Sequence, residues 1–245
     1  MKPPRIYLSP PHMSGREQDY LADAVASNWI APIGPYLDQF ERRMEEVVGI
    51  DHAVALNSGT SALHLAMRQL QLQPGDEVLC SSLTFCASAN PIAYEGAKPV
   101  FLDSEPLTGN IDPQQIEEEL RDCAARGQLP KAIVVVDLVG SSVDMDVVLE
   151  IANRFEVPVV EDAAEALGST YRGVHVGAKA WTSVFSFNGN KILSTSGGGV
   201  LCCRDSRVAE MTRHLATQAR EPAAHYQHER IGFNYRGRGR SVGST

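Results

Sequence analysis

The stretch DHAVALNSGTSALHLA, residues 51–66, decides the fold of this chain. Its first part, 51–56, is a short apolar run of strand length, and a helical spacing of apolar residues starts at Thr60. Asn57, Ser58 and Gly59 join the two parts as a small polar turn. A strand, a tight turn and a helix in this order are typical of the repeating unit of a parallel α/β sheet.

The same alternation continues along the chain. We expect further strands at 77–81, 99–103, 132–137, 157–160, 182–187 and 198–203, the fourth of which delivers Glu161 and Asp162 at its end. Helical spacing predicts helices at 14–28, 36–48, 60–73, 87–94, 112–125, 144–155 and 206–219. This rhythm predicts an α/β fold with a mostly parallel, doubly wound sheet and helices on both faces. In such sheets ligands collect at the carboxyl ends of the strands.

The composition and net charge of the chain argue against some classes of function. The chain has 245 residues, 43% of them hydrophobic, and a formal net charge of -8, which argues against a nucleic-acid partner. No apolar stretch reaches the length of a signal peptide or a membrane span, so we expect a cytoplasmic protein without a membrane partner. The five cysteines lack the spacing of a zinc site and read as reduced core thiols, so no metal is expected.

Three polar segments follow expected strands. The first, 57–63, presents free backbone N–H groups and hydroxyls at a helix N-terminus, which suits a phosphate; an ordinary helix cap is the alternative. The second, 159–168, carries Asp162 at a strand end, where an acid can pair with a protonated ring nitrogen; a solvated turn is the alternative. The third, 183–199, bears Lys191 before a glycine run; a hairpin turn with a surface lysine is the alternative.

Together these segments supply a phosphate cup, an acid for a ring nitrogen and an amine. The strings NSGTSAL (57–63), EDAAEALG (161–168) and SFNGNKI (186–192), in this order, resemble the DegT/StrS family of nucleotide-sugar aminotransferases. Further similarity lies in NWI (28–30), GP (34–35), TF (84–85) and GFNYR (232–236), so the resemblance covers about 6–236. An ordered set of motifs is far more specific than any one of them.

The resemblance implies the aspartate-aminotransferase type of fold and pyridoxal 5'-phosphate as cofactor. It implies transfer of an amino group from an amino-acid donor, glutamate by family resemblance, to a nucleotide-linked keto sugar. Such reactions serve amino-sugar, surface-polysaccharide or secondary-metabolite biosynthesis, and the family's site is built at a homodimer interface. Lys191 would be the catalytic residue, which holds the cofactor as a Schiff base and, once released, moves a proton. Relatives with His in place of this lysine are dehydratases, so the aminotransferase branch is favoured.

The other site residues follow from the same resemblance. Asp162 would bind the ring nitrogen of the cofactor, and Glu165, where many relatives have Gln, would lie near its ring oxygen. Phe85 would stack on the ring, although an aromatic residue after a strand is more often part of the core. The residues expected to hold the phosphate are Gly59, Thr60, Ser61 and Ser186, with Asn234 reaching the phosphate of the neighbouring subunit.

The resemblance ends before the chain does. We expect residues 1–236 to form the cofactor-binding large domain with an N-terminal substrate and dimer segment. Residues 237–245 do not match the family and have no apolar period, so we expect a disordered tail, with the family's small C-terminal domain missing. An alternative to a working aminotransferase is therefore a truncated, inactive remnant that at most binds cofactor or a full-length partner.

Overall fold

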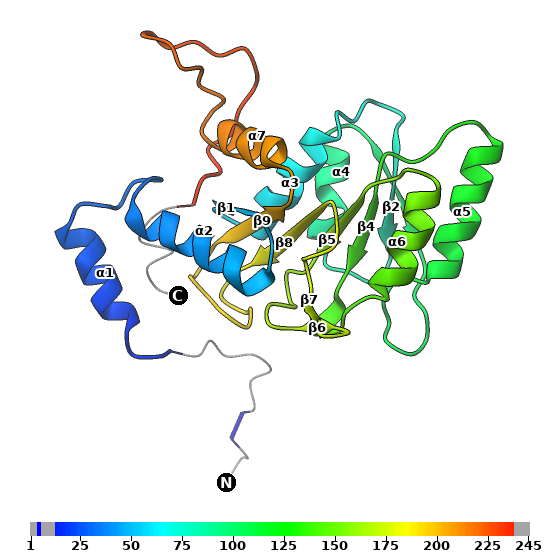
Figure 1. Ribbon diagram of the computed structural model, residues 1–245, viewed down its shortest axis with the longest axis horizontal. Coiled ribbons are helices and arrows are strands. Elements are labelled where there is room, and N and C mark those ends of the chain that lie inside the picture. The colour runs from blue at the N-terminus through cyan, green and yellow to red at the C-terminus, as the bar shows by residue number, and fades with distance from the viewer. Residues whose placement is uncertain (1–3, 6–12, 238–245) are drawn as a thin grey trace.

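A seven-stranded sheet forms the centre of the described part of the chain, as the computed structural model shows (Figure 1). The structure describes residues 4–5 and 13–237. Along the sheet the strands lie in the order β1-β9-β8-β5-β4-β2-β3. Their bounds are β1 (His52–Leu56), β2 (Glu77–Ser81), β3 (Lys98–Leu102), β4 (Ile133–Val136), β5 (Val159–Asp162), β8 (Thr182–Ser186) and β9 (Gly199–Cys203).

The sheet is mostly parallel, as the sequence predicts. Strands β3, β2, β4, β5 and β8 pair in parallel with their neighbours, and β9 runs antiparallel between β8 and β1. The parallel strands β2, β4, β5 and β8 are buried almost throughout because helices cover both of their faces. Their carboxyl ends therefore meet at one edge of the sheet, where the polar segments follow.

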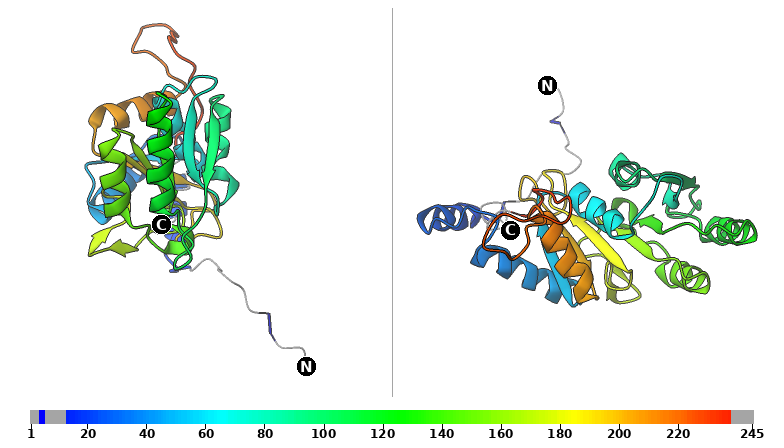
Figure 2. Two further views of the ribbon diagram at one scale, coloured as in Figure 1. Left: turned by 90° about the vertical axis from the view of Figure 1, so that its right-hand side faces the viewer. Right: turned by 90° about the horizontal axis from the view of Figure 1, so that it is seen from above.

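Helices pack on both faces of the sheet (Figure 2). One face packs against α3 (Gly59–Gln69), α4 (Asn90–Tyr94) and α7 (Ser206–Ala216). The opposite face packs against α2 (Pro35–Val48), α5 (Pro113–Ala125) and α6 (Met145–Arg154). Helix α1 (Glu17–Ala26) lies apart from these layers in Figure 1. The doubly wound α/β arrangement predicted from the sequence is thus confirmed.

Side chains form hydrogen bonds with backbone groups at the free edge of β1. Glu41 accepts a hydrogen bond from the Ala55 N–H at 2.7 Å and forms ion pairs with Arg213 and Arg236. Arg213 donates to the Ala53 carbonyl at 3.0 Å, and Arg236 donates to the Ala55 carbonyl at 3.0 Å. These contacts occupy backbone groups that an open edge would offer to another strand. They also attach the segment that follows α7 to the sheet.

Several short elements differ from the sequence-based expectations. Strands β6 (Thr170–Tyr171) and β7 (Val174–His175) form a separate hairpin. The 3-10 turns η1 (Cys86–Ser88) and η2 (Leu138–Gly140) follow β2 and β4. Within the described ranges, no helix has the length and apolar character needed to cross a membrane. Of the expected tail, residues 238–245 lie outside the described residues.

Candidate active site

A cavity of about 350 Å³ opens at the carboxyl edge of the sheet. Residues that follow β1, β2, β4, β5 and β8 line it, so one strand after another contributes to the same space. Seven of the nine residues expected from the sequence line this cavity: Gly59, Thr60, Phe85, Asp162, Glu165, Ser186 and Lys191. Volumes of this size are typical of sites for small molecules and cofactors.

The N-terminus of α3 forms one wall of the cavity. Ser58 caps the helix, since its hydroxyl accepts a hydrogen bond from the Ser61 N–H at 3.0 Å. The N–H groups of the first helical turn have no acceptor within the helix and carry its positive dipole end. Ser186 lies beside them, its Cβ 3.1 Å from the position that a Cβ on Gly59 would take. This wall can therefore bind an anionic group such as a phosphate.

Asp162 lies at the end of β5 with its side chain buried. Its Oδ2 accepts a hydrogen bond from the Ser88 hydroxyl at 2.5 Å, and its Oδ1 accepts one from the Ala164 N–H at 3.2 Å. Burial raises the pKa of Asp162, while the Ser88 and Ala164 hydrogen bonds and the charge of Lys191 act to lower it. A buried carboxyl group that touches a cavity can hold a protonated ring nitrogen.

Lys191 and Glu165, which both line the cavity, form an ion pair. Lys191 Nζ lies 2.9 Å from Glu165 Oε1, and the Val139 N–H of η2 donates to Glu165 Oε2 at 3.1 Å. Burial raises the pKa of Glu165, but the hydrogen bond and charge of Lys191 and the Val139 N–H outweigh this effect, so that pKa is lowered. A carboxylate thus holds the Lys191 amine in place at the cavity wall.

The remaining expected residues differ in their placement. Phe85 is 74% exposed and lines the cavity, so the alternative that it belongs to the core is wrong. Ser61 is buried beneath the helix start, where its hydroxyl donates to Asn57 Oδ1 at 2.6 Å, and it does not line the cavity. Asn234 also lies outside the lining; its carbonyl accepts a hydrogen bond from Asn57 Nδ2 at 3.2 Å.

Sequence reasoning missed some residues of the site. Ser88 contacts Asp162 from η1, and no motif indicated it, because a serine within a short turn has no distinctive spacing. Asn188 and Asn190 line the cavity and belong to the SFNGNKI string, so their position before the lysine was a usable signal. Thr84 also lines it and precedes Phe85.

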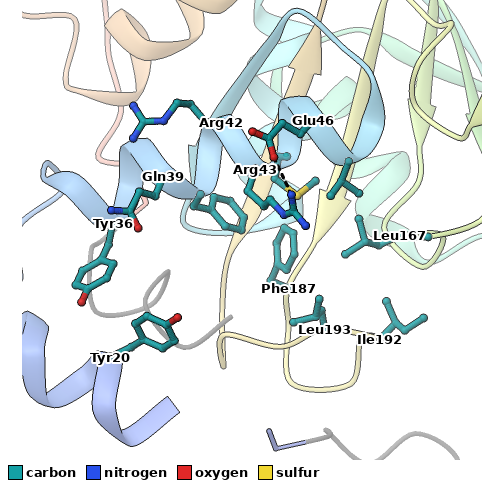
Figure 3. A pocket seen from close by; sticks show the side chains of 14 residues that line it. Tyr20, Tyr36, Gln39, Arg42, Arg43, Glu46, Leu167, Phe187, Ile192 and Leu193 are labelled. Atoms are coloured by element: carbon teal, nitrogen blue, oxygen red, sulfur yellow. Dashed lines mark hydrogen bonds and ion pairs between the residues drawn. The ribbon is translucent and has the colours of Figure 1, made fainter. Parts of the chain in front are cut away.

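A second hollow, of about 730 Å³, lies between α2 and the segment that follows β8. Figure 3 shows aromatic and aliphatic side chains around it, with an ion pair between Arg43 and Glu46. Ile192 and Leu193 face this hollow, whereas Lys191 lines the other cavity. None of the nine expected residues lines the larger hollow, so we take the smaller cavity as the candidate site.

Solved structures of aminotransferases share this fold. PseC of Helicobacter pylori, an aminotransferase involved in the biosynthesis of pseudoaminic acid, matches with a TM-score of 0.91 at 27% identity, over 98% of this chain and 64% of that chain. The chain belongs to the DegT/DnrJ/EryC1/StrS aminotransferase family, whose model matches residues 11–237.

Curated relatives agree with the family. "Putative pyridoxal phosphate-dependent aminotransferase EpsN" of Bacillus subtilis (strain 168) is 53% identical over 95% of this chain and 60% of its own length. The GDP-perosamine synthase of Caulobacter vibrioides (strain ATCC 19089 / CIP 103742 / CB 15) is 42% identical over 95% of this chain and 61% of its own. The chain thus spans about three fifths of the length of these relatives.

Pyridoxal phosphate is the cofactor of this family, and the residues of the cavity fit it. The α3 terminus suits the phosphate, the buried Asp162 carboxyl suits the ring nitrogen, and Lys191 offers the amine. Phe85 adds an exposed aromatic face at the rim. Each chemical part of the cofactor would therefore find a suitable group near a strand end of one sheet.

Proposed function

We propose that this chain supplies the cofactor domain of an aminotransferase that moves an amino group from an amino acid to a nucleotide-linked keto sugar in the cytoplasm. One observation carries the proposal: an amine, a buried acid and a helix N-terminus converge on one cavity. Family membership supports the reaction class, and the name of the GDP-perosamine synthase supports a nucleotide-linked sugar. Glutamate is the donor we propose, by family resemblance, within amino-sugar, surface-polysaccharide or secondary-metabolite biosynthesis.

Lys191 has the central role in this proposal. Bound pyridoxal phosphate would supply an aldehyde that carries the amino group and a ring that takes up electrons. Lys191 would attach the cofactor through its amine and, when released, carry a proton at Nζ between the substrate carbon and the cofactor carbon. Glu165 supports this role because it holds Nζ 2.9 Å away at the cavity wall.

The other residues would bind and orient the cofactor. Asp162 would hold the proton on the ring nitrogen, and its burial strengthens that contact because the local dielectric is low. The N–H groups of Gly59 and Thr60 and the hydroxyls of Thr60 and Ser186 would bind the phosphate. We propose Ser61 as an indirect contributor, which supports the helix cap through Asn57 and Ser58.

We further propose that the working protein is a homodimer. Large apolar side chains lie exposed in this region: Phe85 at 74% lines the cavity, Val139 at 83% is bonded through its N–H to Glu165, and Ile192 at 66% follows Lys191 and faces the second hollow. Exposed apolar groups clustered at a site favour coverage by a partner. Asn234 does not line the cavity of its own chain, which agrees with a role toward the neighbouring subunit's phosphate.

A half-reaction experiment tests the proposed function. The protein is loaded with pyridoxal phosphate and mixed with glutamate alone, and the cofactor absorbance is followed. Conversion of the cofactor to its amine form, with release of 2-oxoglutarate, is expected, and Lys191→Ala should abolish it. If no common amino donor gives the amine form, the transaminase proposal fails and the alternative of an inactive, cofactor-binding remnant is favoured.

A further inference from the structure

Two buried carboxyl groups, those of Asp137 and Glu161, lie near Asp162 at the carboxyl edge of the sheet, and Asp137 is also among the residues that line the candidate cavity. The register of β4 and β5 pairs Val135 with Glu161 and Val136 with Asp162. Because side chains alternate along strands, Glu161 and Asp137 leave the sheet on the same face, on neighbouring strands. Asp137 is 0% exposed and Glu161 is 1% exposed.

Each of these carboxyl groups has one oxygen with a partner and one without. Asp137 Oδ1 accepts a hydrogen bond from the Val143 N–H, and Glu161 Oε1 accepts one from the Gly177 N–H, both at 3.0 Å. Asp137 Oδ2 and Glu161 Oε2 are buried and have no donor among the described residues. Two carboxylates cannot donate to each other, so a proton between these two oxygens would satisfy both.

A buried water molecule accounts less well than a shared proton for the two oxygens that lack a hydrogen-bond donor. The small cavity against Glu161 has a volume of about 10 Å³, which is at the lower limit for one water molecule. Asp137 does not line that cavity, so a water there would leave Asp137 Oδ2 without a donor. A shared proton needs no additional molecule.

The surroundings place the proton on Glu161. Among the described residues, the titratable groups that line the cavity against Glu161 or interact with the charge of the pair are Asp162, Tyr171, His175, Lys179 and Cys202. Lys179 Nζ also lies 2.5 Å from Asp146 Oδ1. The positive charge of Lys179 therefore acts on Asp146 as well as on the acid pair. Burial, followed by the charge and hydrogen bond of Asp137, raises the pKa of Glu161 well above its usual range. Burial raises the pKa of Asp137 to about 6, against the lowering effect of the Val143 N–H and the Glu161 hydrogen bond.

We propose that Glu161 donates a retained proton to Asp137 and that the two act as positioning residues for Lys191. Asp137 begins the turn η2: its N–H donates to the Asp162 carbonyl at 3.1 Å, and its carbonyl accepts from the Gly140 N–H at 3.2 Å. Fixing the Asp137 side chain therefore fixes the start of η2. The part of the proposal that concerns Lys191 rests on the proposed function.

The turn transmits this constraint to the amine. Val139 has a φ of 52°, in the left-handed region that β-branched residues rarely adopt, so its surroundings must hold it there. In this conformation its N–H reaches Glu165 Oε2 at 3.1 Å, and Glu165 Oε1 reaches Lys191 Nζ at 2.9 Å. The acid pair thus acts on Lys191 through η2 and Glu165.

Infrared spectroscopy of the cofactor-free protein tests the shared proton directly. The wild type should show a protonated carboxyl band at neutral pH, and Glu161→Gln should lose it. Gln at this position can donate an N–H to Asp137 and accept from Gly177, so the variant should fold. Asp162→Asn is the control for the other buried acid of the region and should keep the band. A band that persists in Glu161→Gln, or is missing from the wild type, overturns the proposal.

The pH dependence of stability is a second readout that needs no cofactor. The folded protein keeps a proton that the unfolded chain releases above the ordinary Glu pKa of about 4.5. Because the folded state then binds more protons, the free energy of unfolding falls as pH rises. Urea unfolding between about pH 5 and pH 8 should show this fall in the wild type and a smaller one in Glu161→Gln. Equal slopes in the two proteins would contradict a retained proton.

Cofactor loading tests the positioning role. Glu161→Ala removes the donor to Asp137, whereas Glu161→Gln restores one. At neutral pH we expect Glu161→Ala to slow borohydride-trapped attachment of pyridoxal phosphate at Lys191 at least severalfold, and Glu161→Gln to remain near wild type. Equal loading of folded Glu161→Ala and wild type would refute the positioning role. If Glu161→Ala does not fold, slow attachment of pyridoxal phosphate in Glu161→Gln refutes the positioning role. Failure of the wild type to load at Lys191 would count against the proposed function and leave the infrared and stability tests decisive for the pair.

Discussion

Lys191 Nζ and Glu165 Oε1 lie 2.9 Å apart, although 26 residues separate them in the chain. The Lys191 side chain is 13% exposed and that of Glu165 is 41% exposed. Strands β5 and β8, which precede the two residues, are parallel neighbours, and this pairing brings them together. The pair places a charged amine at the wall of the candidate site.

Glu165→Gln should weaken this pair and reduce stability at neutral pH by less than about 1 kcal/mol, because the carboxylate is partly exposed. The lowered pKa of Glu165 means that its contribution is present above the ordinary value of about 4.5 and is lost as pH falls through the lowered value. Urea unfolding of both proteins from neutral to acidic pH checks this. A stability difference that persists at the acidic end would contradict it.

Ser88→Ala should weaken cofactor binding through Asp162. The Ser88 hydroxyl donates to Asp162 Oδ2 and lowers its pKa, so its loss should raise that pKa further. Less of the carboxylate is then ionised, and we expect roughly tenfold weaker binding of pyridoxal phosphate, which corresponds to about 1.4 kcal/mol. As pH is lowered, the affinity should begin to fall at a higher pH in the variant than in the wild type.

Absorbance titrations with pyridoxal phosphate at several pH values measure this effect. Ser81→Ala is a matched control, because it removes a buried hydroxyl that has no hydrogen-bond partner within the described chain. Equal affinities for Ser88→Ala and Ser81→Ala at every pH would show that the Ser88 contact does not tune Asp162.

Gly199→Ala should distort the phosphate wall. A Cβ at Gly199 would lie 2.3 Å from the Ser58 carbonyl carbon and 2.5 Å from the Gly59 nitrogen, so β9 and the start of α3 must separate. Overpacking of this kind costs about 1–3 kcal/mol, and the displaced helix terminus should bind phosphate-bearing ligands more weakly.

Gly189→Ala provides the comparison, since no atom lies within 4 Å of the position its Cβ would take. Thermal unfolding and pyridoxal phosphate affinity should change strongly in Gly199→Ala and little in Gly189→Ala. Similar small effects in both variants would mean that the close approach of β9 to Ser58 is not needed.

Glu41→Ala should destabilise the edge of the sheet. The carboxylate is buried and pairs with Arg213 and Arg236, and removing one partner of a buried ion pair costs about 3–5 kcal/mol. Glu46→Ala on the same helix removes an ion pair with Arg43 that is exposed, and should have little effect. Chemical denaturation compares the two; equal losses would contradict the role given to burial.

The sequence predicted the strands well because parallel strands covered on both faces read as short apolar runs, such as 133–136. The antiparallel direction of β9 was not predictable, since an apolar strand looks the same in either direction. Likewise, no propensity predicts a left-handed Val139, which tertiary contacts impose.

The candidate site was predictable where residues follow strand ends in recognisable strings, as Lys191 and Asp162 do. The contacts that support them were not, because Ser88 and Asp137 reach the site region only through the packing of η1 and η2. The positions of Ser61 and Asn234 outside the cavity lining also depend on tertiary packing rather than on motif spacing.

The most direct test of the central claim is to identify the lysine that binds the cofactor. The protein is incubated with pyridoxal phosphate, reduced with borohydride and digested, and the modified peptide is identified by mass spectrometry. Our account predicts modification at Lys191, at the wall of the 350 Å³ cavity, and its loss in Lys191→Ala. Modification at Lys98, Lys131 or Lys179 with Lys191 unmodified would contradict it.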